Sequence, residues 1–299
     1  SNALIRHLIY SDTSVRLDIA NSLCGKIGTE FNSEFIKNNE SFYKAEVRSL
    51  DFSSAESPKI INDWVSVNTN KKIEKIVEKI PPEALLYLIN AIYFKGTWTD
   101  KFDKELTKEQ DFKLPDGKTK KVQMMSRYDD FKYAKSDKFE VVSLPYGKEL
   151  MSMYVFLPTG NLEDFYKELT SDNWKNWMKE LKKTKGEVGL PRFKNEYEKS
   201  LNDVLKTLGM TEAFSDKADF KKIFAKDTAA SITEVKHKSF IEVNEEGTEA
   251  AAVTSVEVGA TSFMPVSKPF KMIMDKPFFY VLRDNQSGTI LFMGAVNKP

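Results

Sequence analysis

The sequence predicts an α+β fold in which a large mixed β-sheet is surrounded by helices. Residues 15–19 alternate between apolar and polar side chains, which indicates a strand with one buried face. Residues 85–94 are apolar on both faces apart from Asn90, which is typical of a central strand covered on both sides. A run with helical spacing after Ser57 adds an amphipathic helix of the kind that lies on a sheet.

The first half of the chain supplies two strands and this helix before the central strand. A second strand is predicted over residues 45–52. Ser57 is a good N-cap and Pro58 suits the first helical turn, so the helix is expected to begin there. Its residues at helical spacing are Ile61, Trp64, Val65 and Asn68.

The second half predicts a hairpin, short helices and further strands. The apolar runs 139–146 and 151–157 flank Gly147 as a hairpin, and two short helices come next. Ser200 is expected to cap a helix that ends at Gly209. The apolar stripe of that helix is Leu201, Val204, Leu205 and Leu208. The remaining predicted strands are 186–197, 233–243, 278–282 and 289–296.

Composition favours one folded domain and excludes partners that are recognised by bulk charge. The chain has 299 residues, of which 41% are hydrophobic, and this supplies a substantial core. No linker or repeat marks a boundary, so residues 4–299 are expected to form a single domain. Lys and Arg number 45 against 44 Asp and Glu, which leaves no field to gather nucleic acid or an anionic membrane.

The cysteine, the histidines and the start of the chain bear on disulfides, metal sites and the length of the natural protein. Cys24 is the only cysteine, so no intramolecular disulfide can form. With only His7 and His237 in addition, no metal and no cofactor are expected. The sequence holds no apolar stretch of the length that spans a membrane. Residues 1–3, Ser-Asn-Ala, are typical of the remnant of a cleaved tag, so the natural protein is expected to be longer.

The most distinctive segment is 245–254, in which two acids precede a glycine and a run of small residues. Gly247 can act as a backbone pivot. Read as a strand, the segment has one face made of small residues, Thr248, Ala250, Ala252 and Thr254. Such a face can join a sheet that already exists. An alanine-rich linker or a short helix fits the same composition.

Five landmarks occur in a recognisable order along the chain. They are the helix motif Ile60-Ile-Asn-Asp-Trp64, the strand Leu88-Ile-Asn90-Ala-Ile-Tyr-Phe94-Lys-Gly96-Thr-Trp98, the segment Leu190-Pro-Arg-Phe193, then Leu208-Gly-Met210, and finally Leu291-Phe-Met-Gly294. Together with the segment 245–254, these motifs resemble the serpins, the serine-protease-inhibitor superfamily. The resemblance runs from about Leu4 to Pro299 and so covers nearly the whole chain.

The resemblance implies a serpin fold: a large central mixed sheet, two further sheets and surrounding helices. It also implies a prokaryotic-type member that is N-terminally truncated and lacks the first helices of the family. A slot that admits the loop would lie between the strands 85–95 and 233–243, and the helix that carries Trp64 would lie across it. The residues that resemble the family's control of sheet opening are Asn90, Trp98 and His237.

The resemblance also implies a function without enzymatic catalysis. The chain would inhibit serine proteases irreversibly as a suicide substrate, through cleavage of a reactive-centre loop at about residues 247–268 and its insertion into the central sheet. Loop spacing places the cleaved bond between Thr261 and Ser262, with Ala260-Thr261 as the nearest rival and Phe263-Met264 also open. The hinge of this loop would be Glu246, Gly247, Thr248, Glu249, Ala250, Ala251, Ala252, Val253 and Thr254.

The expected partner is a serine protease held in a covalent 1:1 complex. A small residue at the cleaved bond suits the shallow pockets of elastase-like or subtilisin-like enzymes. The protein is expected to be a monomer capable of forming loop-sheet polymers, with an extracellular or cell-surface location. The alternative is a non-inhibitory serpin that acts as a protease substrate or a binding protein. A hydrolase is not indicated, because the sequence has no G-x-S-x-G motif.

Overall fold

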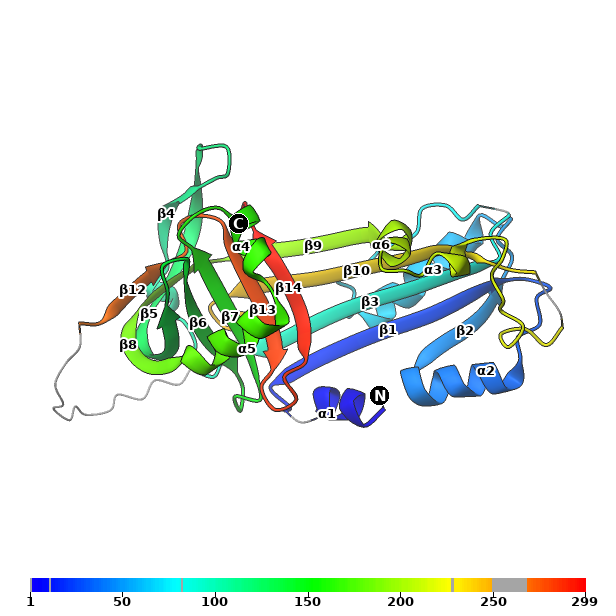
Figure 1. The fold of residues 1–299 in the computed structure, drawn as a ribbon, viewed down its shortest axis with the longest axis horizontal. Coiled ribbons are helices and arrows are strands. Elements are labelled where there is room, and N and C mark those ends of the chain that lie inside the picture. Colours follow the sequence, from blue (N-terminus) through cyan, green and yellow to red (C-terminus); the bar gives the residue numbers. More distant parts are fainter. Residues whose placement is uncertain (1, 11, 82, 227–228, 249–267) are drawn as a thin grey trace. The chain divides into compact units, whose positions relative to one another are not determined.

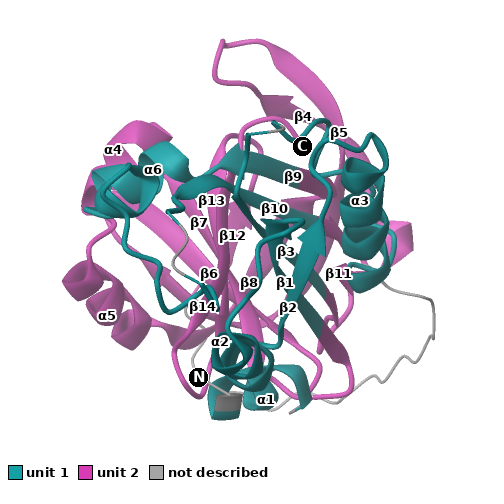
Figure 2. Cartoon of the chain, turned by 90° about the vertical axis from the view of Figure 1, so that its right-hand side faces the viewer, with its two compact units in different colours: residues 1–10, 17–94, 196–241 teal, residues 11–16, 95–195, 242–299 magenta. Residues whose placement is uncertain are grey.

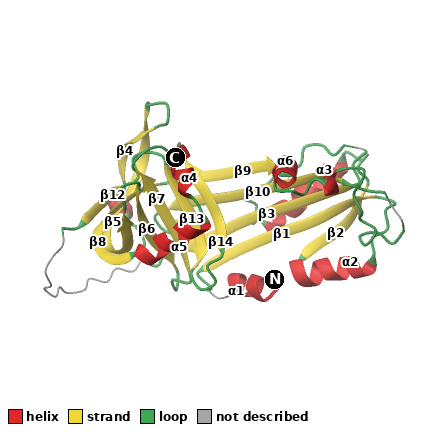
Figure 3. Cartoon of the chain, in the orientation of Figure 1, coloured by secondary structure: helices red, strands yellow, loops and turns green. Residues whose placement is uncertain are grey.

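The computed structural model describes residues 2–10, 12–81, 83–226, 229–248 and 268–299 (Figure 1, Figure 3). The chain forms two compact units (Figure 2). The first comprises residues 1–10, 17–94 and 196–241, and the second comprises residues 11–16, 95–195 and 242–299. The expectation that residues 4–299 make a single domain stays a prediction.

The second unit contains an eight-stranded sheet. Its strands are β4 (Lys108–Lys113), β5 (Thr119–Lys135), β6 (Phe139–Tyr146), β7 (Met151–Pro158), β8 (Lys182–Pro191), β12 (Phe270–Ile273), β13 (Phe278–Asp284) and β14 (Ile290–Val296). They run in the order β12-β8-β5-β6-β7-β13-β14, and β4 pairs with β5. Because the long strand β5 pairs with both β6 and β8, the two further sheets expected from the sequence are continuous.

The other sheet is mixed and six-stranded. Its strands are β1 (Val15–Lys26), β2 (Ala45–Leu50), β3 (Leu86–Thr97), β9 (Phe193–Ser200), β10 (Ile232–Asn244) and β11 (Gly247–Thr248). Their order is β2-β1-β3-β11-β10-β9, and β3 also pairs directly with β10. That pairing is parallel and runs from Leu86 and Ile232 to Tyr93 and Phe240. It confirms that the two strands expected to flank the slot are neighbours.

The helices are short. They are α1 (Asn2–Tyr10), α2 (Ser33–Asn38), α3 (Glu56–Asn68), α4 (Leu162–Glu168), α5 (Ser171–Glu180) and α6 (Asn202–Thr207), with single turns at Asn39–Tyr43, Lys104–Leu106 and Glu212–Phe214. In the part of the chain that the structure describes, no helix has the length and apolar character needed to cross a membrane. Asn2 and Ala3, assigned to a tag remnant from the sequence, belong to α1.

Two helices begin at residues other than those predicted. Ser57 lies inside α3 and is buried, and its hydroxyl donates a hydrogen bond to the backbone oxygen of Asp51 over 2.6 Å. Ser200 donates its hydroxyl to the carboxylate of Glu234 on β10, and α6 begins two residues later. In both helices a partner elsewhere in the chain competes successfully with the local cap.

The apolar stripe predicted for the helix after Ser200 does not face a core. Val204 is 43% exposed and Leu208 is 78% exposed, whereas Leu201 and Leu205 are half-buried. The helix ends near Gly209 as expected, and Gly209 has a φ of 101° that favours glycine. Helical spacing alone therefore identified the helix but not its buried face.

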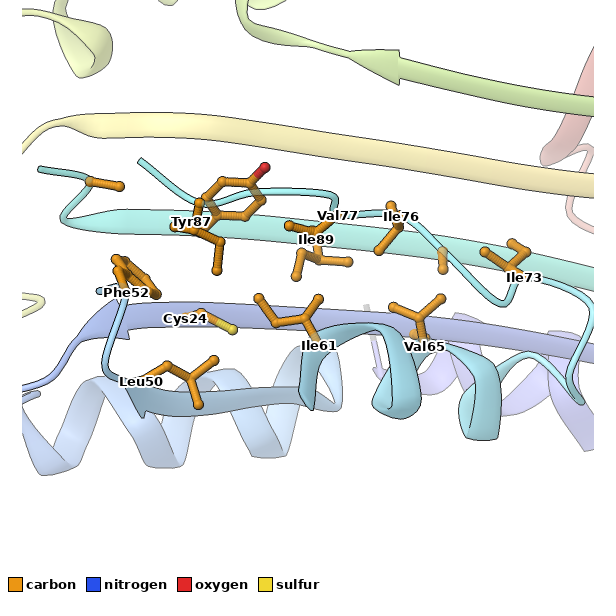
Figure 4. Packing of buried hydrophobic residues seen from close by; sticks show 14 of the residues in the cluster. Cys24, Leu50, Phe52, Ile61, Val65, Ile73, Ile76, Val77, Tyr87 and Ile89 are labelled. Atoms are coloured by element: carbon orange, nitrogen blue, oxygen red, sulfur yellow. The ribbon is translucent and has the colours of Figure 1, made fainter. Parts of the chain in front are cut away.

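In the first unit, α3 and the segment after it cover one face of the sheet. Ile61 and Val65 of α3 are buried with Cys24 of β1 and Ile89 of β3 (Figure 4). Trp64 donates its indole N–H to Glu46 of β2, so this side chain is directed toward β2 and not toward β10. The buried residues of the segment after the helix are Ile73, Ile76, Val77 and Ile80.

In the second unit, α4 and α5 pack against strands of the eight-stranded sheet. Phe165 of α4 and Trp177 of α5 stack with ring centroids 5.8 Å apart. Both contact Phe156 of β7, and Phe165 also contacts Phe279 of β13. These rings bury the apolar face of the two short helices predicted from the sequence, and the hairpin of β6 and β7 predicted before them is confirmed.

Candidate functional site

The start of the predicted hinge is already part of the sheet. The two-residue strand β11 pairs antiparallel with β10 through Val243 and Thr248, and it pairs antiparallel with β3 through Gly247 and Thr97. It therefore lies between the ends of β3 and β10. The rest of the hinge, residues 249–254, and the reactive-bond candidates at 260–264 lie outside the described residues, so those assignments stay predictions.

Gly247 is required by two features of its surroundings. Its φ is 143°, which residues with a side chain rarely adopt. A Cβ placed there would lie 2.0 Å from the backbone oxygen of Gly96 and 2.8 Å from the Cα of Thr97, both on β3. The sequence suggested glycine as a pivot, and the structure adds that β3 comes too close for any larger residue.

Thr248 is buried beside Tyr146 in the second unit. Its side chain is completely buried, and its hydroxyl lies 2.8 Å from the hydroxyl of Tyr146 on β6. Burial raises the pKa of Tyr146, so the phenol is neutral at physiological pH. The Tyr146 ring stacks on the indole of Trp98 with centroids 4.3 Å apart. Thr248 therefore lies at a position without access to solvent, beside one of two stacked rings.

Trp98 contacts the turn that joins β10 to β11. Its indole N–H donates to the backbone oxygen of Asn244 over 2.9 Å, and its backbone N–H donates to the oxygen of Glu246 over 2.9 Å. The backbone N–H of Phe102 donates to the oxygen of Glu245 over 3.0 Å. Trp98 thus lies beside the first residues of the hinge, and its role in sheet opening stays a prediction.

Glu245 anchors the same turn through a nearly buried carboxylate. The side chain is 2% exposed and accepts hydrogen bonds from Arg192, at 2.6 and 2.9 Å, and from the hydroxyl of Thr107 at 2.6 Å. Burial acts to raise the pKa of Glu245, but these hydrogen bonds outweigh it, so the net pKa lies below the ordinary value. The carboxylate is therefore charged and fully paired at neutral pH.

Glu246 is held by two lysines at a more exposed position. Its carboxylate lies 2.6 Å from the ammonium of Lys101 and 3.0 Å from that of Lys104. The hydrogen bond from Lys101 is the main reason why the pKa of Glu246 lies below its usual value. Two adjacent acids of the hinge thus have separate basic partners.

Asn90 and His237 lie opposite each other on β3 and β10 in the first unit. The Nδ1 of His237 is 2.7 Å from the Oδ1 of Asn90, and the Nδ2 of Asn90 donates to the Oδ1 of Asn21 on β1 over 2.7 Å. Because Asn90 Oδ1 accepts, Nδ1 of the imidazole carries the proton. Burial lowers the pKa of His237, which keeps the ring neutral. This chain of amides and imidazole connects three adjacent strands.

Lys238 connects the slot strand β10 to the segment after α3. Its ammonium donates to the backbone oxygen of Lys75 over 2.8 Å and pairs with Glu196 and Glu198 of β9 at 3.0 Å each. Burial acts to lower the pKa of Lys238, but the bonds to the two glutamates outweigh it and the net pKa is raised. The cover of the slot is therefore tied to β10 by this segment, whereas the α3 residue Trp64 is bonded to β2.

Sequence reasoning identified Gly247, Thr248, Asn90 and His237 but missed the groups that hold the hinge turn. These groups are Lys101, Lys104, Thr107, Tyr146 and Arg192, and Lys238, which connects β10 to β9, was also missed. Arg192 was visible within the Leu190–Phe193 motif, and Glu245 preceded the glycine, yet nothing in the sequence joins residues 53 positions apart. Among the described residues, no group of three or more His, Cys, Asp or Glu side chains could hold a metal ion.

Comparison with known proteins identifies the family. The family model described as serpin (serine protease inhibitor) matches residues 1–299. This chain belongs to the serpin family, which is not a family of enzymes.

Individual relatives agree with the family match. Serpin B6 of Pongo abelii is 38% identical over 99% of this chain and 81% of its own length. An uncharacterized serpin-like protein of Methanosarcina mazei is 35% identical over 95% of this chain and 67% of its own length. The native structure of the thermophilic serpin tengpin superposes with a TM-score of 0.87 and 34% identity, covering 96% of this chain and 75% of that one. The α+β serpin fold predicted from the sequence is confirmed.

Proposed function

We propose that this serpin is an irreversible suicide-substrate inhibitor of serine proteases. The observation that supports it best is β11: the first two hinge residues already pair with β3 and with β10, in the position from which a longer strand could grow. Gly247 and the buried Thr248 meet the steric demands of that position. Members of the family that do not inhibit proteases share the fold, so the proposal depends on the hinge.

The protease would perform the chemistry on the loop of this protein. Its catalytic serine attacks the carbonyl carbon of Thr261, the bond to Ser262 breaks, the new amine of Ser262 leaves with a proton, and an ester joins the two proteins. The freed loop then extends β11 as a new strand. Each backbone hydrogen bond contributes about 1 kcal/mol, so ten or more would release on the order of 10 kcal/mol. Displacement of the attached protease then stops hydrolysis of the ester.

The partner in this proposal is an elastase-like or subtilisin-like protease. A threonine before the cleaved bond fits a shallow specificity pocket, and Ala260-Thr261 would fit the same enzymes. Cleavage at Phe263-Met264 would instead suit a chymotrypsin-like enzyme. Mass spectrometry of the released C-terminal fragment distinguishes these bonds, because each gives a fragment with a different first residue.

The proposal also includes the origin and the setting of the protein. We infer a prokaryotic-type serpin, supported by the serpin-like protein of the archaeon Methanosarcina mazei, although Serpin B6 is as similar. We further propose that the protein is a monomer with an extracellular or cell-surface location. Loop-sheet polymers would form from this monomer when the slot opens without cleavage of the loop. Fractionation of the source cells tests the location, and size-exclusion chromatography after heating tests polymer formation.

The decisive experiment replaces Thr248 and monitors the covalent complex. Thr248→Arg puts a charge into a buried pocket beside Tyr146, so we expect covalent trapping to fall at least about tenfold while the loop is still cleaved. Thr119→Arg, at an exposed strand position, is the matched control and should trap normally. The readout is the SDS-resistant 1:1 species formed with elastase and with subtilisin.

The outcome separates inhibition from the alternative function. If the unmodified protein is cleaved by both enzymes without forming an SDS-resistant species, it is a protease substrate and the inhibitory proposal is wrong. If Thr248→Arg traps as well as the control, insertion through β11 is wrong even though inhibition stands. A large rise in the unfolding midpoint after loop cleavage is expected if the loop inserts.

A further inference from the structure

Arg127 of β5 is a largely buried cation with few acceptors. Its side chain is 12% exposed, and the guanidinium lies 5.3 Å from the ring centroid of Phe102 and 4.7 Å from that of Phe131. One N–H, on Nη1, donates to the backbone oxygen of Asp100. Burial between aromatic rings removes this charge from water, and it lowers the pKa of the guanidinium.

The remaining donors of Arg127 have no hydrogen-bond acceptor among the described residues. The buried Nε atom is without a partner, and the nearest carboxylate oxygen, on Asp129, is 3.7 Å away. A guanidinium offers five N–H donors in a planar fork, and a buried group of this kind normally has them satisfied. The geometry therefore leaves a charged donor fork open to an oxyanion.

The guanidinium lines a cleft of about 350 Å³ in the second unit. Two further residues that carry hydrogen-bond donors also line the cleft: Ser143, which is buried, and Lys132, which is exposed. Lys132 lies directly opposite Lys183 in the pairing of β5 with β8. Like charges at directly opposite positions destabilise a sheet unless something compensates them.

The acidic groups around the cleft limit what it can accept. Asp130 lies 3.5 Å from the ammonium of Lys183 and compensates it. Asp100, Asp129 and Glu149 also line the cleft, and Asp100 and Glu149 are exposed. Their charges repel anions, so an anion can be held here only if it is small enough to make direct contact with Arg127. The cleft is thus suited to a compact anion.

We propose that this cleft binds a small oxyanion, a carboxylate or phosphate group, which accepts hydrogen bonds from Arg127 and Ser143 and pairs with Lys132. A bidentate contact with the guanidinium fork is the strongest interaction available there. All residues that line the cleft belong to the second unit, so the site is complete within that unit.

The test uses the intact protein and three probes, which are inorganic phosphate, malonate and chloride, at equal ionic strength. Phosphate or malonate should bind saturably in isothermal titration calorimetry and raise the unfolding midpoint, and chloride should do neither. The phosphate and malonate titrations distinguish the two oxyanion classes. Arg127→Gln should weaken binding about tenfold or more, because a hydrogen bond to a charged group is lost.

The control is Arg283→Gln. Arg283 also lies over an aromatic ring, that of Tyr154, and donates to one backbone oxygen, yet it does not line the cleft. If Arg127→Gln does not fold, Lys132→Ala and Ser143→Ala carry the test, and each should weaken binding several-fold. The proposal is overturned if phosphate and malonate act no more strongly than chloride, or if the cleft variants bind like Arg283→Gln. No protease is involved, so failure here leaves the inhibitory function untouched.

Discussion

Two regions of this protein hold sheet strands together by different chemistry. In the first unit, β3 and β10 are joined across Asn90 and His237 by a hydrogen bond between neutral groups. In the second unit, the turn between β10 and β11 is held by Glu245, Arg192 and Thr107 through ionic hydrogen bonds. Charge-assisted bonds are about twice as strong as neutral ones.

The difference suggests a division of roles in the proposed insertion. A neutral pair can separate without leaving an unpaired charge on either of the strands that would part in this proposal. The turn from which the new strand would grow must stay in place while the strand extends, and it is joined strongly. Variants that change one region and not the other test whether the two kinds of contact differ in strength.

The largest effect is expected at Gly247. Gly247→Ala forces a Cβ against the backbone of β3, which must move, so we expect a loss of about 3 kcal/mol or more and a midpoint about 6–12 °C lower. Gly209→Ala is the control, because its φ is also positive but nothing lies within 4 Å of the added Cβ. It should cost about 1–2 kcal/mol, the backbone strain alone. If thermal unfolding shows equal losses of stability for Gly247→Ala and Gly209→Ala, the backbone of β3 does not exclude a Cβ at position 247.

A smaller effect is expected at Glu245. Glu245→Gln removes the charge from the Arg192 contact and should cost about 1–3 kcal/mol. Glu246→Gln, which affects more exposed ion pairs with Lys101 and Lys104, should cost less than about 1 kcal/mol. Urea unfolding at pH 7 measures both. If the second variant loses as much as the first, the buried pair is not the main anchor.

Protonation of Glu245 at low pH should reproduce the loss of stability expected for Glu245→Gln. The pKa of this carboxyl is lower in the folded protein than in the unfolded chain, so its contribution is present above the unfolded value of about 4.5 and is lost as pH falls through the folded value. Unfolding midpoints measured from pH 6 to pH 3 should therefore fall less steeply in Glu245→Gln than in the unmodified protein. Parallel curves would contradict this assignment.

The smallest effect is expected at His237 and appears at milder pH. Its pKa is lower in the folded state than the ordinary value of about 6.5, so the unfolded chain takes up a proton first and stability falls as pH drops below that value. We expect the midpoint to fall by a few degrees between pH 7.5 and pH 5.5, and less in His237→Gln. An equal fall in the unmodified protein and in His237→Gln would contradict this assignment.

Local patterns in the sequence predicted the strands and the hinge glycine well. Alternation located β1, two-sided apolarity located β3, and the small residues after Glu246 drew attention to Gly247 and Thr248. Each of these signals depends on neighbours along the chain or on the limits that packing places on one side chain. Such signals can be read from the sequence without knowledge of the tertiary structure.

The partners of these residues could not be predicted in the same way. Thr107 and Arg192 reach Glu245 across 138 and 53 residues, and the choice among many lysines and arginines is made by the fold. Ser57 and Ser200 fit the rule for N-caps, but each hydroxyl found a partner elsewhere. Polar contacts between distant residues depend on strand register, which local composition does not determine.

The short strand β11 also has a consequence for alignment. Any strand that grows from Thr248 inherits a phase that is already set, because a slip of one position would exchange its two faces. With Thr248 directed inward, the alternate positions that come next in the sequence are Ala250, Ala252 and Thr254, while Glu249 falls on the opposite side. The register of the new strand would therefore be fixed before the loop is cleaved. Each further residue would then add to a strand whose alignment with β3 and β10 is already determined.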